Sequence, residues 1–153
     1  DGIQDIEKEI RNISHDLNKD ALLEKDSFQA IVGNLFEEYK NTTGLAYQIE
    51  MDEKINWKKI DNTIKIHLYR IFQEALQNIY KYASATEVIL DVVKDDDSIL
   101  IEINDNGQGF DVAKMREGIG LKNMQSRIKT INGNFTIESV IGKGTSIKIT
   151  IPA

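Results

Sequence analysis

The feature that most constrains the fold is a short apolar strand that runs into a glycine-rich turn. Residues 99–103 form the strand, and Asp105-Asn106-Gly107-Gln108-Gly109-Phe110 follows it. Because strand side chains alternate between two faces, Asp105 shares a face with the isoleucines of the strand. Burying a carboxylate without a partner costs several kcal/mol, roughly. Two interpretations stay open. The stretch is either a turn whose aspartate caps its own backbone, or a ligand site in which the glycines let a ligand come close to the backbone.

The composition limits the class of protein. Of 153 residues, 41% are hydrophobic and 29% are charged, as in a single globular domain with a real core. The net charge of −6 argues against a nucleic-acid interface, and no apolar run is long enough to span a bilayer. The absence of cysteine fits a reducing compartment. The chain begins Asp-Gly without an initiator Met, so we expect a fragment of a longer protein.

Hydrophobic periodicity predicts the element order α-α-β-α-β-β-α-β-β. We expect a helix over residues 3–17 with a narrow a/d seam, typical of helix-on-helix pairing. Further helices are predicted at 28–39, about 58–82 and 121–131, and strands at 45–51, 88–93 (apolar on both faces), 99–103, 135–140 and 146–151. The later strands are joined as hairpins. The fold class is therefore α/β (α+β), a two-layer sandwich with a mixed, mostly antiparallel sheet, helices on one face and an N-terminal helical stub.

Two local signals mark helix ends. Asp26 or Ser27 is expected to cap the helix that begins at residue 28. Gly133 lies where the last helix would end, and glycine is favoured there because it adopts a left-handed backbone without strain.

A polar stripe near the end of the long helix could serve a ligand. Glu74 and Asn78 are four residues apart and Lys81 is three further on, so they share one side of the helix. Their oxygens suit Mg²⁺, which also shares phosphate oxygens, and lysine is a point-charge partner for phosphate. A solvated helix face is the alternative.

Two more groups fit the same ligand. Thr145 has the strand parity of Ile147 and the later isoleucines, so its hydroxyl points to the covered face, as the Asp105 carboxylate does. Gly118 and Gly120 lie at a helix N-terminus, which favours phosphate. Together with the helix stripe, these residues describe a site for a magnesium nucleotide.

Four motifs, in this order, resemble those of the GHKL ATPases. Gln73-Glu74-Ala75-Leu76-Gln77-Asn78 with Lys81 is similar to the N box, and Asp105-x-Gly107-x-Gly109 to the first glycine box. Gly118-x-Gly120-Leu121 and Gly142-x-Gly144-Thr145 are similar to the later boxes. Within this superfamily the chain most resembles sensor histidine kinases of two-component systems.

The resemblance implies a Bergerat fold that binds ATP and Mg²⁺. It implies that Asn78 ligates Mg²⁺, that Glu74 supports the metal or orients its water, and that Lys81 reaches the phosphates. Tyr82 stands where the family commonly has histidine, a departure that could alter phosphate contacts. The run 68–75 and the short lid resemble the subgroup whose partners are response regulators of the LuxR/NarL type.

The same resemblance assigns the base and the lid. Asp105 would accept a hydrogen bond from the adenine amino group, and Thr145 would assist through water. The lid, residues 111–117, would close over the phosphates with the help of Gly107, Gly109, Gly118 and Gly120. Leu121, which follows the last of these glycines, would also contact ATP.

The resemblance also divides the chain. Residues 1–20 would end a dimerisation and phosphotransfer hairpin, and residues 21–153 would form the catalytic domain, which passes the ATP γ-phosphate to a histidine for relay to a response-regulator aspartate. His15, followed by Asp16, looks like an acceptor, but its surroundings resemble the second helix of that hairpin. We therefore expect the acceptor upstream of residue 1, in a protein that is a homodimer when complete.

Rival functions remain within the superfamily. A serine kinase of the anti-sigma type, a gyrase- or chaperone-like ATPase, and a nucleotide-binding module without transfer activity all share these motifs. In each case we expect the fragment to work in the cytoplasm, with no nucleic-acid or membrane contact of its own, whether or not the full-length protein is anchored in a membrane.

Overall fold

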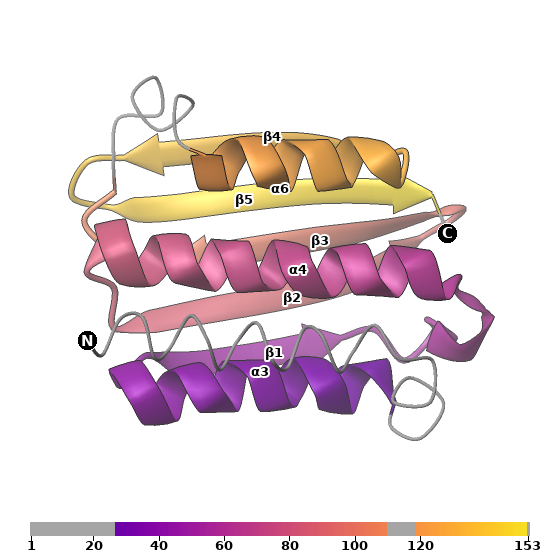
Figure 1. Cartoon of the computed structure of the whole chain (residues 1–153), viewed down its shortest axis with the longest axis horizontal. Helices are drawn as coiled ribbons and strands as arrows, with labels where there is room; N and C mark the ends of the chain where they lie inside the picture. Colours follow the sequence, from indigo (N-terminus) through magenta and orange to yellow (C-terminus); the bar gives the residue numbers. More distant parts are fainter. Residues whose placement is uncertain (1–26, 110–118, 153) are drawn as a thin grey trace.

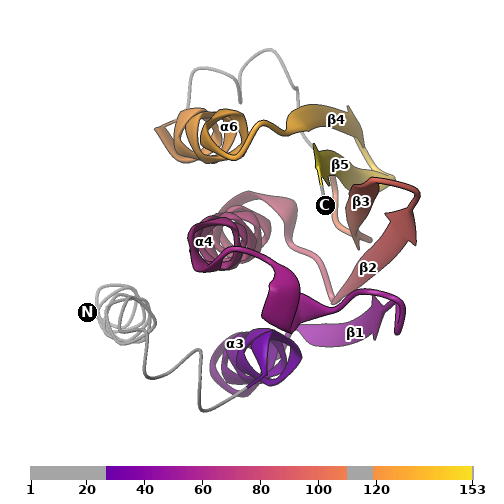
Figure 2. The same cartoon turned by 90° about the vertical axis from the view of Figure 1, so that its right-hand side faces the viewer.

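The computed structural model describes residues 27–109 and 119–152. The helix predicted over residues 3–17 and the predicted lid lie outside these ranges. The described residues form two layers, a twisted sheet and a set of helices on one of its faces (Figure 1, Figure 2). The predicted two-layer α/β sandwich is confirmed.

The sheet is mixed and mostly antiparallel, as predicted. Its order is β1-β2-β3-β5-β4, where the strands span Ala46–Met51, Glu87–Asp95, Ser98–Asp105, Gly144–Pro152 and Asn134–Val140 in that order. In the part of the chain that the structure describes, β1 and β2 are the one parallel pair, and the other neighbouring pairs are antiparallel. Two parallel strands need a crossover connection, and α4, residues Asn62–Asn78, supplies it.

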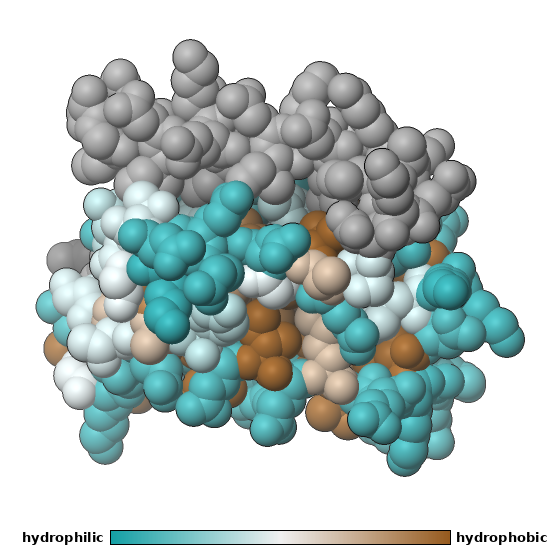
Figure 3. All heavy atoms as spheres, turned by 90° about the horizontal axis from the view of Figure 1, so that it is seen from below, coloured by the Kyte–Doolittle hydropathy of each residue, from teal (hydrophilic) through white to brown (hydrophobic). Residues whose placement is uncertain are grey.

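Among the described residues, three α-helices cover one face of the sheet (Figure 2). They are α3 (Phe28–Thr43), α4 and α6 (Ile119–Thr130). The inward side of α3 is apolar, and all six of its residues are buried: Phe28, Ile31, Val32, Leu35, Phe36 and Tyr39. From the side of α3 and β1, hydrophilic side chains cover most of the described surface and hydrophobic ones show between them (Figure 3). The chain thus sorts its residues by face, as amphipathic elements require.

The far face of the sheet is partly exposed. The strand at 88–93 was predicted to be largely apolar on both faces. In β2, Val88 and Leu90 are fully buried, whereas Val93 is 47% exposed. Among the described residues no helix packs on that face, so an apolar sequence here did not mean burial on both sides.

Helix ends follow their local signals in one case and depart in the other. Ser27 caps α3 as predicted: its Oγ accepts from the Ala30 N–H at 3.1 Å. At the end of α6 the left-handed residue is Asn132, with φ of 60°, and not Gly133. The Gly133 N–H instead bonds to the Ile128 carbonyl at 2.8 Å. Asparagine tolerates this conformation because its short polar side chain can bond locally.

The long helix is shorter and more complex than predicted. A separate 3-10 turn, Trp57–Lys59, precedes it, and Asp61 caps α4 by accepting from the Thr63 N–H at 2.8 Å. Lys65 then holds the turn, because its Nζ donates to the Trp57 carbonyl at 2.9 Å. The α-helix ends at Asn78 and continues as a π turn, Ile79–Ala83. No helix within the described residues is long and apolar enough to cross a membrane.

Candidate functional site

The predicted site residues gather at one end of the two layers. The end of α4, the end of β3, the start of β5 and the start of α6 all lie at the left of Figure 1. Strand register gives the closest link: Asp105 of β3 and Thr145 of β5 are directly paired. The sheet therefore brings together two residues that are forty positions apart in the chain.

Asp105 has the inward orientation that strand parity predicted. It is half-buried, and burial raises the pKa of its carboxyl, while the N–H groups of Gly107 and Thr145 act to lower it. Its Oδ1 accepts from the Gly107 N–H at 2.8 Å, so the turn-capping interpretation is correct. A carboxylate has about four acceptor positions. Capping therefore leaves Asp105 able to accept from a ligand as well, and the two interpretations are compatible.

The glycines after Asp105 serve a close backbone packing. A Cβ on Gly107 would lie 2.3 Å from the Ala83 carbonyl oxygen, and one on Gly109 would lie 2.2 Å from that of Val140. Gly109 also has a φ of 70°, which side chains rarely allow. The glycine turn therefore packs closely against the π turn on one side and against the β4–β5 hairpin on the other. The predicted role of these glycines in lid closure stays a prediction.

Hydrogen bonds hold the same three segments together. The Gln108 N–H donates to the Ala83 carbonyl at 2.7 Å, and the Gln108 carbonyl accepts from the Gly142 N–H at 2.5 Å. Asn106 adds a further clamp: its Oδ1 accepts from the N–H groups of Thr86 and Glu87, at 2.9 and 3.0 Å. Sequence reasoning missed Asn106, although asparagine beside a glycine is a known turn signal.

The remaining glycine motifs are placed only in part. Gly120 is the second residue of α6, which fits the predicted helix N-terminus, while Gly118 lies outside the described residues. Leu121 is 2% exposed and belongs to the hydrophobic core. Its contact with a nucleotide stays a prediction.

The polar stripe on α4 spans a change of helix type. Glu74 and Asn78 lie in the α-helix, half-exposed, whereas Lys81 lies in the π turn and is exposed. A π turn is wider than an α turn and is frequent at functional sites. It has no distinct sequence periodicity, which is why regular helix was predicted to continue to residue 82.

Glu74 has a neighbour that the sequence did not reveal. Arg127 of α6 lies near enough that Glu74 raises its pKa, although burial and Arg70 have the larger, lowering effect. His67 faces the same two arginines, and burial is the main cause of its lowered pKa. His67 is thus part of the contact between α4 and α6.

Thr145 is 6% exposed, and its partner was also missed. Ser139 of β4 is its direct neighbour in the sheet, and the two hydroxyl oxygens are 3.0 Å apart. Parity alone would place Ser139 on the inner face with Ile137. The contact itself depends on the register of the hairpin.

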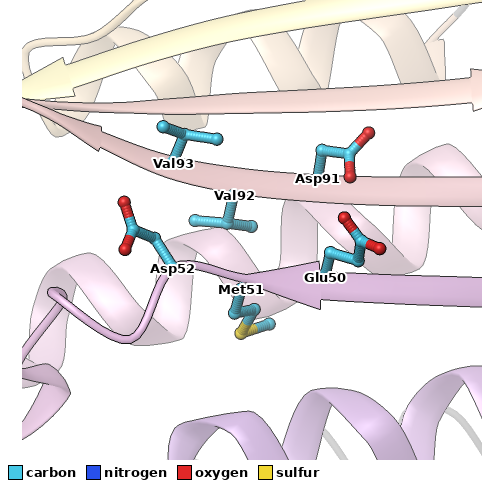
Figure 4. A pocket seen from close by; sticks show the side chains of 6 residues that line it. All are labelled: Glu50, Met51, Asp52, Asp91, Val92 and Val93. Carbon is cyan, nitrogen blue, oxygen red and sulfur yellow. The ribbon is translucent and has the colours of Figure 1, made fainter.

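A surface hollow of about 230 Å³ lies elsewhere. It is lined by Glu50, Met51, Asp52, Asp91, Val92 and Val93, between the ends of β1 and β2 (Figure 4). Asp52 uses its carboxylate to accept from the N–H groups of Lys54 and Lys94, at 3.0 and 3.1 Å. Because Asp105 pairs with Val88 at the start of β2, the hollow is at the opposite end of that strand. We assign it no ligand.

The oxygen atoms offered at the predicted site suit a nucleotide with its metal ion better than a metal ion held by protein ligands alone. Within residues 27–109 and 119–152 no three acidic, histidine or cysteine side chains cluster to hold a metal ion. The oxygens of Asn78 and Glu74 would fill only part of the coordination shell of Mg²⁺. Water and phosphate oxygens would supply the rest, as is usual for Mg²⁺ in nucleotide sites. Asp105, half-buried and accepting, suits a base with an amino group.

This two-layer fold and the arrangement of its site are those of a nucleotide-binding ATPase domain. The family described as histidine kinase-, DNA gyrase B-, and HSP90-like ATPase matches residues 63–153, and the chain belongs to it. The match begins at the second residue of α4 and includes all four glycine and helix motifs. ATP is therefore the nucleotide that this family membership implies.

Curated relatives of the chain are sensor proteins. The chain is 39% identical over 95 residues to the sensor protein VraS of Staphylococcus aureus, which covers 61% of this chain and 27% of that protein. The chain thus spans about a quarter of the length of the curated relatives it matches.

Solved structures with the same fold are histidine kinase domains. The histidine kinase domain of the Erythrobacter litoralis EL346 blue-light activated histidine kinase has a TM-score of 0.70 at 16% identity, covering 82% of this chain and 60% of that one. The mycobacterial sensor histidine kinase MprB has a TM-score of 0.62 at 15% identity, and the match covers 81% of this chain and 93% of that one. At these identities the likeness shows the fold.

Proposed function

We propose that this chain carries the ATP-binding catalytic domain of a two-component sensor histidine kinase. Residues 21–153 form that domain and residues 1–20 end the dimerisation hairpin. The observation that carries the proposal is the direct pairing of Asp105 with Thr145, at the end of the layers where the α4 stripe also ends. The family membership and the sensor protein among its relatives support this proposal.

In this proposal each residue has one task. Asp105 accepts from the adenine amino group, and Thr145 assists through water. Asn78 ligates Mg²⁺, Glu74 supports it, and Lys81 reaches the phosphates. When bound, Mg²⁺ supplies charge neutralisation for the transferred phosphoryl group. The protein itself contributes positioning and electrostatics and forms no covalent intermediate.

The partners follow from the reaction. The phosphoryl group passes to a histidine on the dimerisation domain, upstream of residue 1, and from there to a response regulator of the LuxR/NarL type. The first step uses ATP, and both steps use proteins of the cytoplasm, so we place the domain there, as part of a homodimer. His15 is not the acceptor in this proposal.

A labelling experiment tests the proposal. We expect this chain to bind ATP but to transfer little label to itself, because its acceptor helix is missing. Adding a fragment of the full-length protein that carries the upstream helix should give strong labelling of that fragment. The label should be lost in acid and kept in alkali, as for phosphohistidine.

Two controls separate the alternatives. Strong self-labelling of this chain that disappears in His15→Ala would make His15 the acceptor and contradict the domain assignment. Acid-stable label on a partner would favour the serine kinase. ATP hydrolysis without any transfer would favour an ATPase of the gyrase or chaperone kind.

A further inference from the structure

The helices α4 and α6 carry an excess of positive charge in a chain that is negative as a whole. The net charge of the chain is −6. Between Asn62–Asn78 and Ile119–Thr130 the two helices hold one acidic residue, Glu74, against five basic ones: Lys65, Arg70, Lys122, Arg127 and Lys129. Because the two helices pack side by side (Figure 1, Figure 2), part of this charge is brought to the contact between them.

Three side chains gather at this contact. His67 and Arg70 are three residues apart on α4 and therefore share one side of the helix, and Arg127 comes from α6. Burial is the largest cause of the lowered pKa of His67, and both arginines lower it further. Burial and then Arg70 lower the pKa of Arg127. Since each group acts on another, the three form one basic cluster.

The basic cluster has polar atoms without partners. The Nδ1 of His67 and the Nε atoms of Arg70 and Arg127 are buried, and none of them has a hydrogen-bond partner within the described residues. Unpaired buried polar atoms are rare in native proteins, and a bound ion is one explanation for them. The three side chains as wholes are only half-buried, so a small ion can reach their other N–H groups from solvent.

Glu74 does not balance the two arginines. It follows Arg70 by four residues, on the same side of α4. Its carboxylate acts to raise the pKa of Arg127, but this is the smallest of the three effects on that group. One carboxylate beside two guanidinium groups leaves a net positive charge, and the basic cluster therefore favours an anion.

We propose that His67, Arg70 and Arg127 form a binding site for a phosphate group. The planar guanidinium group suits phosphate because two of its N–H groups can donate to two phosphate oxygens. A phosphate dianion has enough oxygens to accept from both arginines and from the imidazole. The site lies beyond Glu74 as seen from Asn78, because Arg70 precedes Asn78 by eight residues, about 12 Å along a helix.

Two sources can supply the phosphate group. One is the terminal phosphate of a nucleotide, and this source rests on the proposed function. The other is free phosphate, and this source is independent of it. Both present the same oxygens to the basic cluster, so the experiment has an arm for each.

The test follows the imidazole of His67 by proton NMR in the whole chain. The chain has two histidines, His15 and His67, and His67→Gln assigns their signals. Inorganic phosphate, added at constant ionic strength, should move the His67 signal along a saturable curve. It should also raise the pKa of His67, because a neighbouring anion stabilises the imidazolium. The His15 signal reports any general effect of added phosphate.

Variants show whether the arginines bind the phosphate. Arg127→Gln and Arg70→Gln should each weaken phosphate binding about tenfold or more, the loss expected for a charge-assisted hydrogen bond. Lys122→Gln is the matched control, because it removes the same charge from an exposed position of α6, and it should leave the affinity unchanged. Phosphate should also raise the Tm of the native chain more than that of Arg127→Gln. Circular dichroism checks that each variant folds.

Two arms separate the sources. If a nucleotide supplies the phosphate group, ATP with Mg²⁺ should move the His67 signal more than ADP does, and Arg127→Gln should weaken ATP binding more than ADP binding. If free phosphate supplies it, inorganic phosphate should move the His67 signal equally with and without ATP. Either result supports the site.

The site is overturned if neither inorganic phosphate nor ATP moves the His67 signal along a saturable curve, or if the curve is the same in Arg127→Gln. ATP binding, measured separately by calorimetry, keeps this outcome distinct from the proposed function. A native chain that binds phosphate at the basic cluster but does not bind ATP contradicts the proposed function alone. A native chain that binds ATP while His67 stays unresponsive contradicts the phosphate site alone.

Discussion

Replacing Asp105 with asparagine is expected to weaken ATP binding by about 100-fold while the fold stays intact. A hydrogen bond to a charged group contributes roughly 1.5–3 kcal/mol, and the asparagine amide would add a donor facing the adenine amino group. The side-chain oxygen can still cap the Gly107 N–H, which it accepts at 2.8 Å in the native chain. Calorimetric titration with ATP measures the loss.

The control for this variant is Asp91→Asn. Asp91 is a half-exposed aspartate of β2, the strand beside β3, away from the Asp105 end. Its replacement removes the same charge from the same sheet and should leave ATP affinity unchanged. Survival of native affinity in Asp105→Asn would show that the adenine assignment is wrong.

Asp105 should also leave a signature in the pH dependence of stability. Burial raises its pKa in the folded chain above the ordinary value of 3.8. The folded state therefore holds this proton more tightly than the unfolded state does. Its contribution to stability is complete below pH 3.8 and declines as the pH rises through the folded pKa.

The asparagine variant tests that sign. The variant has no carboxyl to ionise at this position. Its free energy of unfolding should therefore rise relative to that of the native chain as the pH rises from about 3.5 to 7. Urea unfolding of both proteins across this range measures the difference. A native chain that gains on the variant with rising pH would mean that the N–H groups of Gly107 and Thr145 outweigh burial.

Replacing Gly107 with alanine is expected to destabilise the fold by about 3 kcal/mol, near the upper end for overpacking. The backbone of Gly107 has no positive φ, so alanine could adopt it. The cost comes from the new Cβ, which would lie 2.3 Å from the Ala83 carbonyl oxygen and 2.7 Å from the Ala83 Cβ. Backbone atoms on both sides must move, and the Gln108 to Ala83 hydrogen bond with them.

Gly33→Ala is the matched control for this change. Gly33 lies inside α3, and nothing comes within 4 Å of a Cβ built there. Alanine in a helix interior is favoured over glycine by about 1 kcal/mol, so this variant should be more stable than the native chain. Thermal unfolding followed by circular dichroism compares the two. A neutral Gly107→Ala would show that the turn and the π turn are not in close contact.

Some features of the site were predictable because they depend on local patterns. The parity of the two strands placed Asp105 and Thr145 on the covered face, since every second side chain of a strand shares a face. The apolar face of α3 and its Ser27 cap were predictable for the same kind of reason. These signals extend over only a few neighbouring residues.

Other features needed the tertiary structure because they depend on contacts between distant segments. The Ser139 hydroxyl meets Thr145 only through the hairpin register, and Arg127 reaches Glu74 only because α6 packs beside α4. The π turn that carries Lys81 has no periodic signal. Position 107 requires glycine because any Cβ there would clash with the carbonyl of Ala83, which lies 24 positions earlier in the chain.

The sequence by itself determined the fold class, the family and the faces on which the site residues lie, because hydrophobic periodicity and motif spacing are local. Only the tertiary structure decided that Asp105 is paired with Thr145, and that the glycine turn joins the π turn after α4 to the last hairpin. Backbone register and close approach belong to the packed chain, and no stretch of sequence contains them.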